Sequence, residues 1–150
     1  MDTTGIASSD ALDAARALIR ITRIIDSDFR ASPEMDGLTV MELSALGGID
    51  RGLDLPSVLA RRLHLDPSRV TRLTDHLVAA GLIEREPVPG DRRLCRLRLT
   101  SEGTAKLTAG REKLRAIMSS LMSGLTDAER AGLELGLQGI RREAGPHESS

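Results

Sequence analysis

Apolar residues recur at helical spacing near the start of the chain. Between Asp10 and Arg30 they form a broad stripe, which predicts a first helix: Leu12, Ala15, Ile19, Ile21, Ile24, Ile25 and Phe29. The residues before this helix, 1–9, are expected to be disordered. The stripe is wider than contact with a small core requires, so the helix is expected to pack against a second surface as well. Arginines at positions 16, 20 and 23 are interpreted as solvated, with contact to an anionic ligand as the alternative.

Capping and turn residues predict two shorter helices in the next segment. Thr39 and Glu42 have the spacing of a capping box, which predicts the start of a second helix. The two glycines at 47–48 are expected to close it. A short strand is expected at 53–55. A third helix is expected from Pro56 through His64.

Residues 66–103 hold the most specific pattern in the sequence. Asp66 is a good N-cap and Pro67 fits the first helical position, so a helix is predicted to begin there and to end at Gly81. One face of this helix is apolar and comprises Val70, Leu73, Leu77 and Val78. The other face is polar and basic and comprises Ser68, Arg69, Thr71, Arg72 and His76.

A β-hairpin is predicted directly after this helix. A short strand is expected at 82–86, and the sequence PVPGD at 87–91 is expected to form the turn because proline lacks a backbone donor. Apolar and basic residues alternate at 94–99, the period of a half-buried strand. Arg92 and Arg93 then stand at or beside the tip, where long cations can contact phosphates or enter a minor groove.

Two helices are predicted for the rest of the chain. Thr100 caps a long helix, and Thr126 with Glu129 forms a second capping box. The buried face of the last helix is expected to carry Leu133, Leu137 and Ile140. Together these elements predict a mainly α fold with a small β wing (α+β), in which a winged helix-turn-helix is flanked by further helices.

Two stretches of the sequence resemble the MarR family of bacterial transcriptional regulators. Residues 91–103, DRRLCRLRLTSEG, match the family's wing signature DxRxxxxxLTxxG. Residues 68–87, SRVTRLTDHLVAAGLIEREP, resemble the family's recognition helix and first wing strand without gaps. Two departures are visible, because His64 stands where glycine is usual and His76 stands where a basic residue is more common.

The resemblance implies a fold, a partner and a set of contacts. Residues 1–150 would form a single MarR-like domain, with a winged helix at 38–100 and dimerisation helices at 10–30 and 101–144. The protein would act as a homodimer on a pseudo-palindromic operator in double-stranded DNA, as a repressor, with release by a small-molecule effector. The expected DNA-binding residues are Ser68, Arg69, Thr71, Arg72, His76, Asp91, Arg92 and Arg93. Among them, Asp91 is expected to orient the wing by pairing with an arginine.

The distribution of charge fits this prediction better than the total charge does. The formal net charge is −1, but residues 61–98 contain nine arginines and five acids, a local balance of +4. A basic module on an acidic body suits a DNA-binding protein, since local potential acts on the phosphates. Two of the arginines, Arg96 and Arg98, have an alternative interpretation as cross-strand partners of Glu84 and Glu86.

Composition and the absence of known motifs argue against a disulfide-linked, membrane-spanning or enzymatic protein. The single cysteine, Cys95, excludes an intrachain disulfide and is interpreted as a small buried hydrophobe, with a redox sensor as the alternative. No apolar run approaches the roughly 20 residues of a membrane span, and the N-terminus does not look like a signal peptide, so a cytoplasmic protein is expected. No metal, cofactor or catalytic motif is evident, which argues against an enzyme. The rival interpretation is a winged-helix protein-interaction module without specific DNA binding.

The identity of an effector does not follow from the sequence. With one Phe and no Trp or Tyr, the chain offers little aromatic stacking surface. An effector pocket is therefore expected to be lined by aliphatic residues and methionines such as Met41 or Met118.

Overall fold

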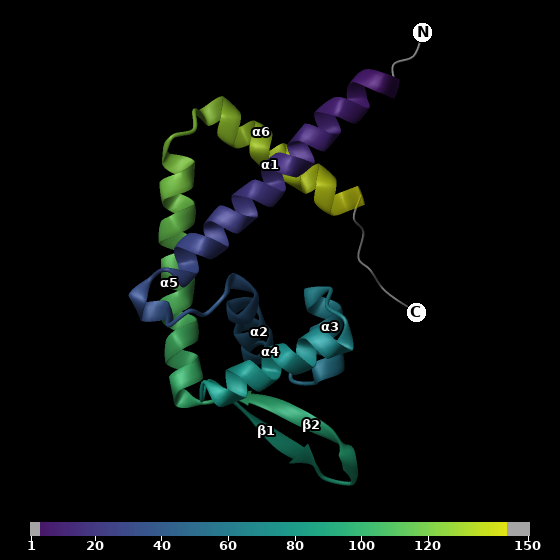
Figure 1. The fold of residues 1–150 in the computed structure, drawn as a ribbon, viewed down its shortest axis with the longest axis vertical. Coiled ribbons are helices and arrows are strands. Elements are labelled where there is room, and N and C mark those ends of the chain that lie inside the picture. Colours follow the sequence, from purple (N-terminus) through teal and green to yellow (C-terminus); the bar gives the residue numbers. More distant parts are fainter. Residues whose placement is uncertain (1–3, 144–150) are drawn as a thin grey trace. The chain divides into compact units, whose positions relative to one another are not determined.

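The computed structural model describes the backbone of residues 4–143 and the side chains of 10–91 and 93–143. In this part of the chain the order of elements is α1, η1, α2, α3, α4, β1, β2, α5 and α6 (Figure 1). They form two compact units, of which one ends at Arg115 and the other begins at Ala116. The predicted mainly α fold with a small β wing is confirmed.

Helix α1 is longer than the sequence pattern indicated. It extends over Thr4–Arg30, so the prediction of disorder before Asp10 is wrong for residues 4–9, while residues 1–3 lie outside the described chain. No proline interrupts the backbone hydrogen bonds there. Near its C-terminal end, Phe29 is fully buried and anchors α1 to the core. The short 3-10 helix η1 follows at Pro33–Met35.

Helix α2 (Val40–Asp50) begins as predicted and ends later. The capping box is confirmed: the Glu42 backbone N–H donates to Thr39 Oγ1 at 3.1 Å, and the Thr39 N–H donates to Glu42 Oε2 at 2.8 Å. The prediction that Gly47 and Gly48 close the helix is wrong. Gly48 instead permits close packing, since a Cβ there would lie 2.9 Å from Leu59 Cδ1 of α3.

The next two helices form the helix-turn-helix. Helix α3 (Pro56–Leu63) ends at His64, which adopts the left-handed conformation with φ of 53°. Histidine tolerates this conformation better than most residues, so the turn is kept where glycine is usual. Helix α4 is Pro67–Ala79, and Asp66 is its N-cap, whose side chain accepts a hydrogen bond from the Arg69 backbone N–H. Helices α2 and α3 pack together, as do α3 and α4.

The strand predicted at 53–55 is not present in the described chain. This segment lies against the wing but makes a single backbone hydrogen bond to it, from Leu97 N to Asp54 O at 2.7 Å. One such bond does not create a third strand, so the sheet in the described chain has two strands in the order β1-β2.

The hairpin is longer than predicted. Strand β1 is Ile83–Val88 and strand β2 is Asp91–Leu99, so the prediction that the turn begins at Pro87 is wrong. Pro87 pairs with Cys95, and the register shifts between Pro87 and Val88. Proline is accepted because this is a two-stranded sheet with an irregularity at that point. The turn is made around Gly90, whose φ is +87°.

The first unit closes around a core of apolar side chains. The largest fully buried ones come from α1, η1, all three helices of the winged helix and both strands: Phe29, Met35, Leu46, Leu59, Val70, Leu77, Ile83 and Leu97. Helix α5 (Ser101–Ser123) packs onto this core through glycine. A Cβ on Gly103 would lie 1.9 Å from Leu82 O, and a Cβ on Gly110 would lie 2.4 Å from Leu43 Cδ1. Only glycine permits the approach to the Leu82 backbone, whereas a Cβ at position 110 would require the end of the Leu43 side chain to move.

Helix α6 (Asp127–Glu143) behaves differently. Its capping box is confirmed, because Thr126 N donates to Glu129 Oε2 at 2.8 Å and Glu129 N donates to Thr126 Oγ1 at 3.3 Å. None of its residues is buried within the single chain. The predicted buried positions Leu137 and Ile140 are 43% and 55% exposed. The face is therefore apolar, but this chain alone does not cover it.

Candidate nucleic-acid interface

Helix α4 divides into a buried and an exposed face. Val70, Thr74 and Leu77 are at most 2% exposed and attach the helix to the core. The five polar positions predicted to meet DNA are all exposed: Ser68, Arg69, Thr71, Arg72 and His76. The structure thus presents these five side chains together on one surface of the helix.

The first turn of this surface is organised around Asp66. Its Oδ1 accepts hydrogen bonds from the Ser68 hydroxyl at 2.6 Å and from the Arg69 backbone N–H at 2.9 Å. The hydrogen bond from the Ser68 hydroxyl, and to a smaller extent the one from the Arg69 backbone, lowers the pKa of Asp66 below its ordinary value. The Arg69 guanidinium also lies 3.3 Å from Asp66 Oδ2. Two of the candidate contacts are therefore oriented by the helix cap itself.

The second turn leaves a free cation. The Thr71 hydroxyl donates to Pro67 O at 2.9 Å, so its oxygen remains able to accept. Arg72 is exposed and has no carboxylate within 4.0 Å among the described residues. An exposed, unpaired guanidinium on this face suits contact with a base edge or a phosphate.

The wing carries its free cation beside the turn. Arg93 is exposed and lacks an acidic partner among the side chains that the structure describes. The Asp91 carboxylate accepts a hydrogen bond from the Arg93 backbone N–H at 2.9 Å, which fixes the start of β2. The side chain of Arg92 lies outside the described side chains. Figure 1 shows the hairpin extending away from the helices of its unit.

The arginines nearer the base of the wing are paired with acids. Arg96 Nη1 lies 2.5 Å from Asp54 Oδ2, and Arg98 pairs with Glu86. This Glu86 contact raises the pKa of Arg98 above its ordinary value. The alternative interpretation of acid pairing therefore holds for Arg98 with Glu86, whereas Arg96 finds its partner in the loop before α3.

Three contacts that no motif in the sequence signals attach α4 to its surroundings. Arg85 of β1 donates to Thr74 Oγ1 at 2.8 Å and pairs with Asp75 at 2.7 Å, which ties the wing to the helix. On the other side, His76 Nδ1 pairs with Glu42 of α2. The residue separations are 10 and 11 for the Arg85 contacts and 34 for the His76 contact, and no local pattern signals contacts at such separations.

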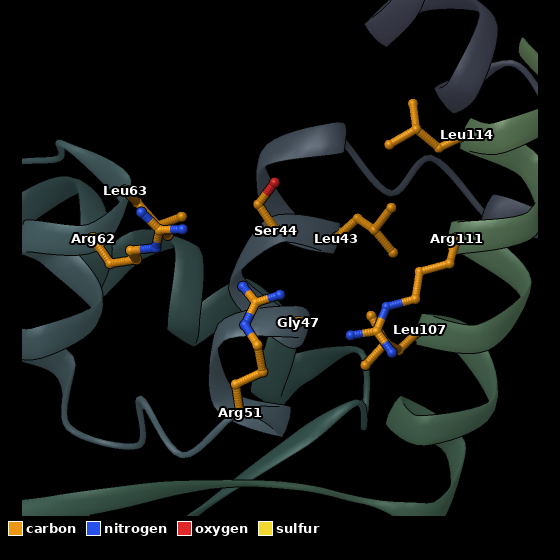
Figure 2. A pocket seen from close by; sticks show the side chains of 9 residues that line it. All are labelled: Leu43, Ser44, Gly47, Arg51, Arg62, Leu63, Leu107, Arg111 and Leu114. Atoms are coloured by element: carbon orange, nitrogen blue, oxygen red, sulfur yellow. The ribbon is translucent and has the colours of Figure 1, made fainter. Parts of the chain in front are cut away.

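A pocket lies on another side of this unit, between α2, the end of α3 and α5 (Figure 2). Its volume is about 390 Å³. Figure 2 shows the guanidinium groups of Arg51 and Arg111 on either side of Gly47. Their nearest guanidinium nitrogens lie 4.0 and 3.6 Å from the position that a Gly47 Cβ would occupy. The rest of the lining comprises Leu43, Ser44, Arg62, Leu63, Leu107 and Leu114.

Other chemistry is not indicated in the described part of the chain. Within 10–91 and 93–143, no three His, Cys, Asp or Glu side chains gather as a metal site would require. Cys95 is a half-buried free thiol in β2. Within 4–143, none of the helices has the length and apolar character needed to span a membrane.

The chain is similar to known transcriptional regulators. A sequence model of the MarR family matches residues 36–94. The HTH-type transcriptional repressor MdtR of Bacillus subtilis (strain 168) is 33% identical over 125 residues, covering 81% of this chain and 81% of that protein.

Solved structures share the fold. Apo MarR from E. coli is 26% identical with a TM-score of 0.68, covering 84% of this chain and 95% of that one. A mutant MarR from E. coli complexed with operator DNA has a TM-score of 0.72 at 23% identity, over 93% of this chain and 99% of that one. The wing signature, the exposed basic face of α4 and these similarities agree. The chain belongs to the MarR family, and it is a DNA-binding transcriptional regulator rather than an enzyme.

Proposed function

We propose that the protein is a homodimeric repressor that binds a pseudo-palindromic operator. The observation that carries this proposal is the exposed face of α4 together with Arg93 on the wing, because neither Arg72 nor Arg93 has an acidic partner among the described side chains. In this proposal Arg69 and Arg72 enter a major groove, with Ser68 and Thr71 as shorter hydrogen-bonding groups. The role as a repressor is supported by the name of the relative MdtR.

The dimer is proposed from the apolar side chains that the single chain leaves in solvent. On α1, Leu12 and Ile19 are 52% and 54% exposed, and on α6, Leu135 and Ile140 are 69% and 55% exposed. Large apolar patches on a monomer mark interaction surfaces. A symmetric dimer would present two copies of α4 to half-sites about one helical turn apart. The proposed location of the protein is the cytoplasm, where bacterial operator DNA lies.

The pocket over Gly47 is proposed as the effector site. Arg51 and Arg62 have no carboxylate within 4.0 Å among the described side chains, and Arg111 lies 3.2 Å from Asp50. Leu43 and Leu107 form a buried apolar floor. This lining suits a small organic anion with an aliphatic body. The pocket has aliphatic residues in its lining, as an effector pocket of this chain is expected to have. Neither Met41 nor Met118 lines it.

Because Arg62 lies on α3, a ligand in this pocket would contact the helix-turn-helix directly. A short branched aliphatic carboxylate should release operator DNA, and its uncharged amide should not. Arg51→Ala and Arg62→Ala should raise the required concentration about tenfold or more, since a charged hydrogen bond is lost. Equal potency of the acid and the amide would contradict this site.

Fluorescence anisotropy with promoter DNA beside the protein's own gene tests the main proposal. Affinity should fall steeply as salt rises, because phosphate contacts release counterions. Arg72→Ala should cost about 1–3 kcal/mol and relax sequence preference. Arg93→Ala should weaken specific and mutated sites about equally. Arg20→Ala, which removes one charge from α1, is the matched control and should change little.

Two outcomes would contradict the proposal. Flat salt dependence, or no binding to promoter DNA, would favour the interaction-module alternative. If Arg72→Ala and Arg93→Ala alter sequence preference alike, the division between a helix that reads bases and a wing that contacts the backbone is wrong.

A further inference from the structure

Helix α4 is attached to α2 through the Glu42 carboxylate, whose two oxygens have different partners. The Glu42 side chain is only 9% exposed. Its Oε2 accepts from the Thr39 backbone N–H at 2.8 Å and from the Thr39 hydroxyl at 2.9 Å. Its other oxygen, Oε1, pairs with His76 Nδ1. The cap of α2 thus holds Glu42 rigidly in place beneath the imidazole.

One nitrogen of the His76 imidazole contacts Glu42, while most of the side chain is exposed to solvent. His76 follows Arg72 by four residues and Arg69 by seven, so all three lie on one face of α4. The His76 side chain is 64% exposed although Nδ1 faces Glu42. Within the described part of the chain, its other nitrogen, Nε2, has no protein partner. Nε2 is therefore the atom that His76 offers on the face proposed to meet DNA.

Glu42 determines which nitrogen of a neutral His76 carries the proton. A carboxylate only accepts hydrogen bonds, so Nδ1 must be the donor and Nε2 is left as an acceptor. A bare acceptor cannot bond to a phosphate oxygen. When the ring takes up a second proton, Nε2–H becomes a donor and the face gains one positive charge, while Glu42 offsets that charge from below.

Other charged groups lie near the ring on α4, on α5 and at Asp36. A small cavity of about 100 Å³ beside His76 is lined by Asp36, by Glu102 and Lys106 of α5, and by apolar residues. Lys106 lies 2.5 Å from Asp36 Oδ2. On α4 itself, Asp75 pairs with Arg85, and the neighbouring cation is Arg72. Glu42 is thus the carboxylate in direct contact with the imidazole.

We propose that His76, positioned by Glu42, is a proton-dependent DNA contact, so that operator affinity rises as pH falls through the range in which histidine gains its second proton. This inference rests on the proposed DNA binding by α4. Its physical basis is linkage: if the bound state holds more protons than the free state, acid favours binding. Glu42 acts here as a positioning residue.

Anisotropy titrations at constant ionic strength between about pH 8 and about pH 6 test the inference. Wild-type affinity should rise about five- to tenfold across this range. His76→Gln should bind with little pH dependence near the weaker level. His76→Lys, whose charge is permanent, should bind near the stronger level at every pH. Glu42→Gln can keep the cap of α2 but should reduce the gain at low pH, because the imidazolium loses its counter-charge.

The other two histidines provide the controls. His64→Asn, which keeps a residue that tolerates the left-handed conformation, and His147→Gln should retain the wild-type pH profile. Nitrogen NMR of the free protein at about pH 8 should show the proton on Nδ1 of His76. A wild-type pH response that survives His76→Gln, or a proton found on Nε2, would overturn the inference. Steep salt dependence without any pH response would overturn it while leaving the proposed function intact, whereas no binding at any pH would overturn both.

Discussion

The winged helix and the terminal helices differ in what they do with their apolar side chains. In the winged helix, Leu46, Leu59 and Leu77 are completely buried within one chain. On the terminal helices, Ile19 of α1 is 54% exposed and Leu135 of α6 is 69% exposed. Burial of a large aliphatic side chain contributes about 1.5–3 kcal/mol. The winged helix is therefore stabilised by apolar burial within one chain. The terminal helices would gain a comparable stabilisation only by packing against a second surface.

The largest expected effect comes from charges on the terminal faces. The double variant Ile19→Asp with Leu137→Asp should convert the protein to a monomer in light scattering, because charged residues would oppose burial of both faces. Operator affinity should fall about a hundredfold or more, since the second half-site contact is no longer intramolecular. Circular dichroism should still report a folded winged helix.

Leu94→Asp is the control for the mass measurement, because Leu94 is 45% exposed on the wing and lies on neither terminal helix. This variant should keep the wild-type mass. A stable monomer of the intact protein at micromolar concentration would remove the distinction between the two regions.

A cavity in the core should act differently from one on the terminal face. Leu77→Ala should lower the free energy of unfolding by about 2–5 kcal/mol, because the residue is fully buried. This loss should be the same at all protein concentrations. Leu137→Ala should destabilise mainly at low concentration, since its effect would pass through the dimer. Urea unfolding at several protein concentrations measures both, and concentration independence for Leu137→Ala would count against the dimer.

Glycines sharpen the same comparison. Gly103→Ala should destabilise by about 1–3 kcal/mol, because a Cβ would lie 1.9 Å from Leu82 O. Among the described residues of the single chain, a Cβ on Gly136 of α6 would meet nothing within 4 Å. Helix propensity alone then predicts a gain of about 1 kcal/mol for Gly136→Ala. If thermal melts show a loss instead, a partner helix packs closely at that position.

The smallest expected effect concerns the two capping boxes. Thr39→Ala should cost about 1 kcal/mol in global stability. At the other box, the backbone N–H and hydroxyl of Thr126 bond to Glu129 and lower its pKa. A lowered pKa in the folded state supports α6 above the ordinary glutamate range and loses that support as pH falls through the lowered value.

Amide NMR of α6 during acid titration measures this support. Thr126→Ala should remove most of the acid dependence in α6 and leave α2 unchanged. The same acid-induced fraying in wild type and variant would show that the second capping box contributes nothing to α6.

Local chemistry made much of the fold predictable. Capping at Thr39, Asp66 and Thr126 depends on contacts within three residues, so the sequence contains both partners. The left-handed turn at His64 and the two strands of the wing follow from short-range preferences as well. The errors at Gly48 and Pro87 have one cause. Glycine and proline were interpreted as breaks, whereas packing against Leu59 and the open edges of a two-stranded sheet accommodate them.

The sequence by itself determined the order of the α-helices and of the two wing strands, the family and the polar face of α4, because these depend on spacing along the chain. Only the tertiary structure decided which of the arginines stay free, since Arg85, Arg96 and Arg98 meet acids in the folded unit. It also brought Glu42 to His76 across 34 residues. Such pairings depend on how helices and strands pack, and a contact between two side chains far apart in the sequence leaves no local pattern in it.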